Sequence, residues 1–190
     1  MKKSENLILS RRVFIASASS LLVGSRLSAM FPFSANLSQV SQELREELTP
    51  EELKLIEKST MAEDLMNYFG KGYSCAESLL MVSLRLLGKS EDMVWAAAGF
   101  GGGLYHKDLC GFLTAGIMGI GFSAGMLKKE RKEAKEYSSR LVKQYWKWWI
   151  SQAPLHCSEI KKKGTSSKVC RRLGQLSAAK VEELIKAAIA

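Results

Sequence analysis

The chain has 190 residues and a formal net charge of +9 at neutral pH. Residues 1–35 carry +4 of this charge, because they hold five basic residues and one acidic residue. The remaining excess lies in runs at 128–135, 161–168 and 171–172, and the first run is interleaved with glutamates, as is typical of a solvated helix face. The charge therefore does not indicate a nucleic-acid-binding protein.

The N-terminal segment has the layout of an export signal. Lys2 and Lys3 precede Ser10-Arg11-Arg12-Val13-Phe14, and a weakly apolar stretch follows. Two adjacent arginines with a large apolar residue two places later resemble the twin-arginine signal. The alternative is a basic amphipathic helix on a membrane face, but serines at 17, 19 and 20 dilute its apolar side. We expect residues 1–35 to be a twin-arginine signal peptide, cleaved near residues 29–36.

This signal predicts a location and a first partner. The twin-arginine translocase would export the chain across the cytoplasmic membrane, leaving it in the periplasm or membrane-associated on the outer side. The apolar run at 13–27 is shorter than the ~20 residues that span a bilayer, so it would be a poor permanent anchor. We expect contact with the membrane only through this segment.

The mature part is predicted to be one helical domain, since about 155 residues remain and alanine, leucine, lysine and glutamate dominate them. Thr49-Pro50-Glu51-Glu52 has the residues of a helix start, namely a capping hydroxyl, a first-position proline and acids in the first turn. That helix is expected to run to Gly70. We divide the chain into the signal at 1–35, a linker and leading helix at 36–60, and a four-cysteine helical redox domain at 61–190.

The later elements follow in chain order. A core helix is expected after Ser74, another from Met93 into the glycine run at 99–103, and a third from Cys110, with glycines at 116, 119, 121 and 125. Such glycines cost helix propensity, so close backbone packing is expected to offset them. Further helices are predicted at 130–150 and 177–188. The fold class is all-α: a compact bundle of about five to six helices with a glycine-rich loop and a buried glycine-rich helix.

Four cysteines, Cys75, Cys110, Cys157 and Cys170, are the candidate functional residues. Their separations of 35, 47 and 13 residues match neither a zinc ribbon nor Cys-x-x-Cys, and no Cys-x-x-Cys-His haem motif occurs. Cys75 and Cys110 each lie just before an apolar helix, where backbone N–H groups and the helix dipole stabilise a thiolate. Cys170 precedes two arginines, so all four positions are expected to favour anionic sulfur.

The residues around these cysteines resemble a known family. Gly72-Tyr73-Ser74-Cys75-Ala76, the Gly101-Gly102-Gly103 loop, Cys110-Gly111 and two later single cysteines resemble the C_GCAxxG_C_C family of redox-active four-cysteine proteins, over roughly residues 61–186. The family is similar to the non-haem part of split-Soret cytochromes. The resemblance implies a helical domain whose cysteines bind an iron–sulfur cluster. Phe112 stands where alanine is usual, and Ala115 where glycine is usual.

Several chemistries remain open for the four cysteines. An iron–sulfur cluster, most simply [2Fe–2S], is the first, and it has support from the signal, because twin-arginine export carries folded cargo with cofactors already inserted. Two disulfides without a cofactor, a structural zinc site and a catalytic dithiol relay are the alternatives. His106 and His156 lie near cysteines in sequence and are candidate substitute ligands, although loop histidines are commoner.

No catalytic constellation is visible, since no Ser/His/Asp set, carboxylate pair or nucleotide loop stands out. The glycine run at 99–103 is interpreted as a bend that lets backbone approach the cysteines. Trp146, Trp148 and Trp149 are expected to pack in the core more readily than over a cofactor. We therefore expect an electron-transfer or accessory protein with a redox enzyme as partner, or else a disulfide-braced interaction protein. A homodimer would suit the glycine-faced helix and any exposed tryptophans.

Overall fold

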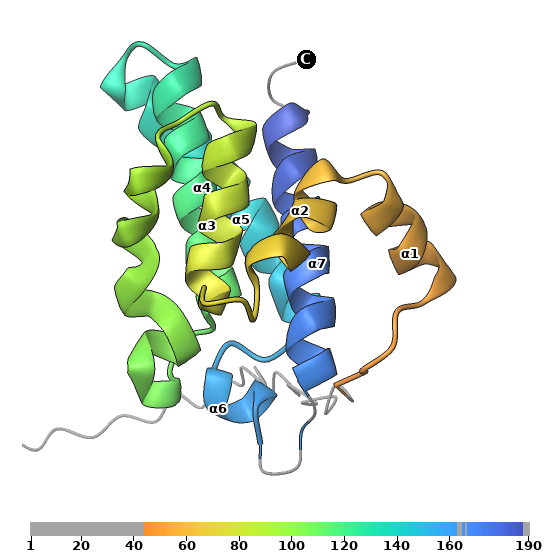
Figure 1. Ribbon diagram of the computed structural model, residues 1–190. Helices are drawn as coiled ribbons and strands as arrows, with labels where there is room; N and C mark the ends of the chain where they lie inside the picture. The colour runs from red at the N-terminus through yellow and green to blue at the C-terminus, as the bar shows by residue number, and fades with distance from the viewer. Residues whose placement is uncertain (1–43, 163–164, 166, 188–190) are drawn as a thin grey trace, which may run out of the picture. The chain divides into compact units, whose positions relative to one another are not determined.

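The computed structural model of the chain describes residues 44–162, 165 and 167–187 (Figure 1). The predicted signal peptide at 1–35 lies outside these residues. The described part contains no strand, only two isolated bridges, so the all-α class is confirmed. More helices are present than the five to six expected; they are α1 (Pro50–Glu57), α2 (Thr60–Tyr68), α3 (Cys75–Leu86), the 3₁₀ helix η1 (Glu91–Phe100), the π-type segment η2 (Gly103–Lys107), α4 (Gly111–Leu127), α5 (Arg131–Gln152), α6 (Cys157–Ile160) and α7 (Ser167–Lys186).

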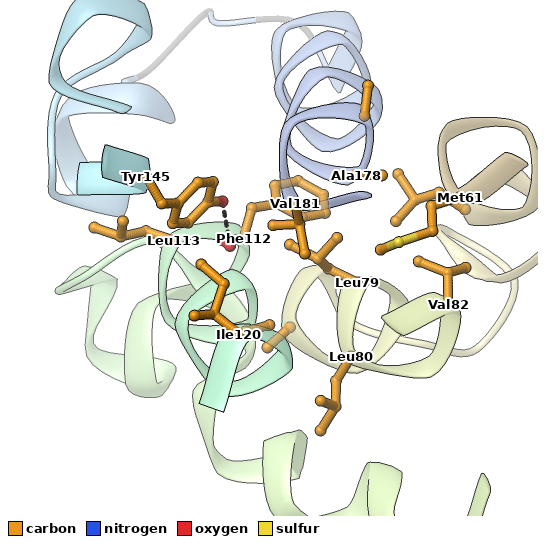
Figure 2. Close-up of a cluster of buried hydrophobic side chains, with 14 of the residues drawn as sticks. Met61, Leu79, Leu80, Val82, Phe112, Leu113, Ile120, Tyr145, Ala178 and Val181 are labelled. Carbon is orange, nitrogen blue, oxygen red and sulfur yellow. Dashed lines mark hydrogen bonds between the residues drawn. The ribbon is translucent and has the colours of Figure 1, made fainter. Parts of the chain in front are cut away.

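The core lies where α3, α4, α5 and α7 meet, with α2 closing one side (Figures 1 and 2). Figure 2 shows side chains from all five helices converging on this space, and the labelled ones are Met61, Leu79, Leu80, Val82, Phe112, Leu113, Ile120, Tyr145, Ala178 and Val181. The Tyr145 hydroxyl donates a hydrogen bond to the backbone oxygen of Phe112 at 3.1 Å, which satisfies a polar group inside the core. None of the described helices is long and apolar enough to cross a membrane.

The glycines of α4 divide into two groups. A Cβ on Gly116 would lie 2.5 Å from the Tyr145 ring, and one on Gly119 would lie 2.7 Å from the Ser83 hydroxyl, so both positions require close helix packing. Gly121 and Gly125 are exposed, and a Cβ there would meet nothing within 4 Å. The prediction of a buried glycine-rich helix is therefore confirmed for the first half of the glycines and wrong for the second.

The expected helix from Thr49 to Gly70 is interrupted. Thr49 forms the predicted cap, with its hydroxyl accepting from the Glu52 N–H, but α1 ends at Glu57 and α2 begins at Thr60. Ser59 causes the break, because its hydroxyl accepts a hydrogen bond from the Ala62 N–H and caps α2. The same hydroxyl donates to the Glu182 carboxylate of α7 at 2.6 Å, an interaction that no local pattern indicates.

The last helix begins ten residues earlier than predicted. We expected it at Ser177, but α7 starts at Ser167. Val169, Leu173 and Leu176 recur at helical spacing and are buried, so tertiary packing extends the helix through a basic, glycine-containing stretch. Cys170 is therefore the fourth residue of a helix and does not lie in a loop.

The segment between η1 and α4 has an unusual backbone. Leu104, Tyr105 and Lys107 have positive φ angles of 57°, 57° and 58°. This left-handed conformation costs a non-glycine residue about 1 kcal/mol or more, and such residues gather at functional sites. The segment follows the predicted glycine-rich bend and leads directly into the turn before Cys110.

Candidate cysteine site

The four cysteines lie near the starts of four helices at one end of the bundle. Cys75 is the first residue of α3, Cys110 is the N-cap of α4, Cys157 is the first residue of α6, and Cys170 lies in the first turn of α7. The beginnings of α3, α4 and α7 and the short α6 are all at the same end of the molecule (Figure 1). The structure thus gathers residues that are distant in sequence.

Backbone hydrogen bonds join the segments that carry Cys110 and Cys157. The Cys110 N–H donates to the backbone oxygen of Leu155 at 2.9 Å, and the Cys157 N–H donates to that of Asp108 at 2.7 Å. These two bonds flank the antiparallel bridge between Leu109 and His156. Both cysteines are buried, at 6% and 7% exposure respectively.

Two glycines allow the backbone to approach the cysteine side chains. A Cβ on Gly111 would lie 2.5 Å from the Cys75 sulfur and 2.9 Å from the Phe100 backbone oxygen. A Cβ on Gly103 would lie 2.7 Å from the Cys157 Cβ, and Gly103 has a φ of +71°. The interpretation of the glycine run as a bend beside the cysteines agrees with this arrangement.

Burial keeps three of the cysteines as neutral thiols. Burial raises the pKa of Cys110 far above its ordinary value, and the neighbouring Cys75 and Cys170 add to this effect. The backbone N–H groups of Phe112 and Leu113 lower that pKa, but they do not outweigh burial. Burial likewise raises the pKa of Cys157, and it raises that of Cys170 to about 11.

This result corrects the expectation that each position by itself favours a thiolate. Helix starts are present at Cys110 and Cys157, but desolvation of the sulfur is the larger effect. Of the two arginines after Cys170, the buried Arg172 binds the Glu52 carboxylate of α1. The cations that act on Cys157 and Cys170 instead include Lys161, with Lys107 also acting on Cys157.

The cysteines affect one another's pKa values, but their side chains are not arranged as a preformed metal site among the described residues. The pKa of Cys170 is raised by both Cys75 and Cys157, that of Cys157 by Cys75, and that of Cys110 by Cys75 and Cys170. All four are free, with no disulfide among them. Within the described residues, no three His, Cys, Asp or Glu side chains are arranged around a single point as a metal site.

An Asp–His pair borders the site. The His156 Nδ1 lies 2.8 Å from the Asp108 Oδ1, and both side chains are about half exposed. His156 therefore has a carboxylate partner, while His106 is exposed in η2. Sequence reasoning missed Asp108, Lys107 and Lys161, since only the long-range pairing of 108–110 with 155–157 brings the Asp108 side chain to His156.

The tryptophans of α5 occupy three different environments. Trp149 is fully buried and donates through Nε1 to the Pro154 backbone oxygen at 3.1 Å. Trp148 stacks on Tyr145 with ring centroids 5.5 Å apart, and Trp146 is 37% exposed. The expectation of core packing is thus met by Trp149 and partly by Trp148.

Phe112, at a position where the resemblance implied alanine, is accommodated by α7. Its side chain is 1% exposed and lies 5.2 Å from the Phe69 ring, centroid to centroid. A Cβ on Gly174 would lie 2.6 Å from the Phe112 ring, so the absence of a side chain at Gly174 makes room for the larger residue. The large side chain at this position is therefore packed inside the domain between α2 and α7.

No curated protein and no solved structure matched the chain. A family model matched residues 73–184, which is more than half of the chain and contains all four cysteines. The family is described as "putative redox-active protein (C_GCAxxG_C_C)". The resemblance seen in the sequence is confirmed, and this chain belongs to the C_GCAxxG_C_C family.

Proposed function

We propose that this chain is an exported redox protein whose four cysteines hold an iron–sulfur cluster, in the simplest case [2Fe–2S]. Its role would be electron transfer, or assistance to a redox enzyme. The observation that carries this proposal is the gathering of Cys75, Cys110, Cys157 and Cys170 near the starts of four helices at one end of the bundle, where backbone hydrogen bonds join the segments of Cys110 and Cys157 and the Cys75 sulfur lies against Gly111.

The chemistry of the donor set fits a thiolate-bound cluster. Iron–sulfur clusters are held by cysteine thiolates, and four are available. The cations that act on these cysteines are Lys161, for both Cys157 and Cys170, and Lys107, for Cys157, and their positive charge would offset bound thiolates. When bound, a cluster would supply one-electron transfer.

The raised thiol pKa values also accord with a cation-dependent site. A buried thiol that is neutral by itself loses its proton when a metal provides the compensating charge, so binding releases protons. A [2Fe–2S] cluster is held by two pairs of cysteines and does not need four sulfurs around one point. Binding would include some rearrangement of the side chains, since no single-point metal site is present among the described residues.

Export of the loaded protein is part of the proposal. The twin-arginine pattern at Arg11 and Arg12 supports a route in which the folded chain, with its cluster, crosses the cytoplasmic membrane. The protein would then act in the periplasm or on the outer side of the membrane. A disulfide-braced protein could travel unfolded and oxidise after export, so it has no need of this route.

The second candidate is a disulfide-braced interaction protein without a cofactor. The proximity of the four thiols is compatible with pairing after oxidation, which would stabilise the domain by a few kcal/mol. Structural zinc is a third candidate, and it requires four thiolates in a closed tetrahedron.

Anaerobic purification of the full chain separates these candidates. We expect visible absorption together with iron and acid-labile sulfide, and we expect Cys75→Ala and Cys110→Ala to lose both. Ser123→Ala is a matched control, because Ser123 is a small buried residue of the same helix as Cys110 and bonds only to the Ile120 backbone oxygen. Stoichiometric zinc without sulfide would contradict the proposal, as would colourless, metal-free protein with no free thiols.

A further inference from the structure

The net positive charge of the described residues comes from one helix and the residues just before it. Residues 128–147 hold eight basic side chains and three acidic ones. This segment contains most of α5 and the three residues that precede it. The other described residues hold fourteen of each sign, so this segment accounts for the entire excess of the described part. We name the eight side chains the α5 basic face; they are Lys128, Lys129, Arg131, Lys132, Lys135, Arg140, Lys143 and Lys147.

The charges of the α5 basic face are not neutralised within the domain. None of the eight takes part in an ion pair in the part of the chain that the structure describes. Seven are exposed, and Lys128 is half-buried. Lys128 and Arg140 lie 5.6 Å and 5.4 Å from the centroid of the Tyr137 ring, a cation–π contact with a group that carries no net charge.

Many of these side chains share one side of the helix. Lys132, Lys135, Arg140 and Lys143 line the same shallow depression on the surface of α5. A second depression, between α4 and α5, has the exposed Gly121 and Gly125 on its floor and further lysines around it. Neither recess contains an acidic partner for the lysines apart from Glu136.

Apolar side chains are exposed at both ends of this surface. Met126, just before the first lysine, is 44% exposed. Trp146 and Ile150 are 37% and 52% exposed, and they follow Lys143 at three and seven residues, which places them on the same side of α5. A helix with a basic side and exposed tryptophan and aliphatic residues has the character of an interfacial helix.

We propose that the α5 basic face docks this domain on an anionic lipid surface, in addition to any contact made by the signal segment. The charge is carried by six lysines and two arginines, and lysine acts as a mobile point charge suited to a fluid layer of headgroups. Arginine, with its fixed fork, would dominate a surface built to bind particular phosphates or bases. The exposed Met126, Trp146 and Ile150 would enter the interface between headgroups and acyl chains. This inference does not depend on what the cysteines bind.

Vesicle binding by the full chain tests the proposal. Flotation with phosphatidylglycerol–phosphatidylcholine vesicles should recover the wild type in 0.1 M salt and recover much less in 0.5 M salt. A lysine near an anionic surface contributes roughly fivefold to binding, so K132Q/K135Q/K143Q should weaken it about a hundredfold. The matched control K58Q/K71Q/K89Q removes three exposed lysines elsewhere and should bind like the wild type.

Both variants keep residues 1–35, so membrane binding by that segment is the same in each. Equal binding by the α5 variant and the control would overturn the proposal. It would also be overturned if the wild type bound a DNA duplex more tightly than these vesicles and lost that binding in the α5 variant.

Tryptophan quenching by brominated lipid gives a second readout. Trp146→Phe should lose most of the quenching, whereas Trp95→Phe should retain it, because Trp95 is 73% exposed but lies on η1. Quenching that disappears with Trp95 and persists without Trp146 would place a different surface at the membrane and contradict the proposal.

Discussion

Gly111 shows how a single missing side chain can position a cysteine. The Cys75 sulfur occupies the place where a Cβ on Gly111 would stand, and the Phe100 backbone oxygen lies behind it. Backbone atoms cannot move aside as the end of a flexible side chain can. An alanine here would therefore displace either the start of α3 or the start of α4, and each carries a cysteine.

Gly111→Ala should accordingly lower both stability and cofactor content. We expect a loss of about 1–3 kcal/mol in the free energy of unfolding, as for other overpacked sites. We also expect less iron per chain after anaerobic purification. Gly121→Ala is the matched control on the same helix, since its Cβ meets nothing within 4 Å, and it should be neutral or up to about 1 kcal/mol more stable. Urea unfolding and iron assay would measure both effects, and equal behaviour of the two variants would contradict this account.

At the level of residues, sequence reasoning found the cysteines but not their neighbours. Cys75 and Cys110 were placed correctly before apolar helices, because glycine loops and helix starts are local signals. The positions of Lys161 and Asp108 depend on a pairing across nearly fifty residues, for which the local pattern carries no information. The raised pKa values of Cys110, Cys157 and Cys170 were missed for the same reason, since burial is a property of the folded chain.

Among the helices, α7 determines where α2 begins. The buried Glu182 carboxylate accepts hydrogen bonds from the hydroxyls of Ser59 and Thr60 and from the Met61 N–H. Burial raises the pKa of Glu182, but the hydrogen bonds from Lys186, Ser59 and their neighbours outweigh it and bring that pKa to about 2. A charged side chain of one helix thus caps the first turn of another.

The stability of the domain should follow the ionisation of Glu182. Because its folded pKa of about 2 is below the ordinary 4.5, its contribution is fully present above pH 4.5 and is lost as the pH falls towards 2. Glu182→Gln should cost roughly 2–3 kcal/mol at pH 7, and the difference from wild type should shrink between pH 4.5 and pH 2.

Denaturant titrations at several pH values would test this expectation. Glu183→Gln is the control, since Glu183 is half exposed and pairs only with Lys180, and it should change stability by less than about 0.5 kcal/mol. A pH-independent loss in Glu182→Gln would show that packing, and not charge, explains the effect.

A helix could be predicted from the sequence where the residues that determine it lie close together in the chain. The start of α1 at the Thr49 cap, Cys75 at the start of α3 and the long α5 were all predicted, because capping residues and apolar periodicity suffice for them. The break at Ser59 involves Glu182, 123 residues away, and the early start of α7 depends on the burial of Val169 and Leu173 in the folded domain. Neither is visible in a short window of sequence.

For the whole molecule, composition predicted the all-α class, while the arrangement of the helices required the structure. The excess of basic residues illustrates this difference. As a total it indicates little, but the structure places all of the excess of the described part on α5 and its leading turn. The fold thus turns the net charge of the chain into a defined surface, the α5 basic face.

The predicted signal can be tested in the intact chain. Replacing both arginines of the motif, as Arg11→Lys with Arg12→Lys, should retain the protein in the cytoplasm, because the twin-arginine pathway reads the arginine pair and not charge alone. Arg26→Lys lies outside the motif and should be exported like the wild type. Cell fractionation with immunoblotting measures the outcome. Export of the double variant at the wild-type level would show that another route is used.

The place of Cys170 on α7 has a consequence for the order of folding. Cys75 and Cys170 are 95 residues apart in sequence, so bringing them together closes a long loop. Non-local contacts of this kind form slowly, since the entropy of loop closure is lost before the contacts stabilise the chain. α7 must dock before the fourth sulfur reaches the other three. A chain in which Cys170 has reached the other three cysteines has therefore already docked α7, and the rate at which its thiols become protected from alkylation would report the progress of folding.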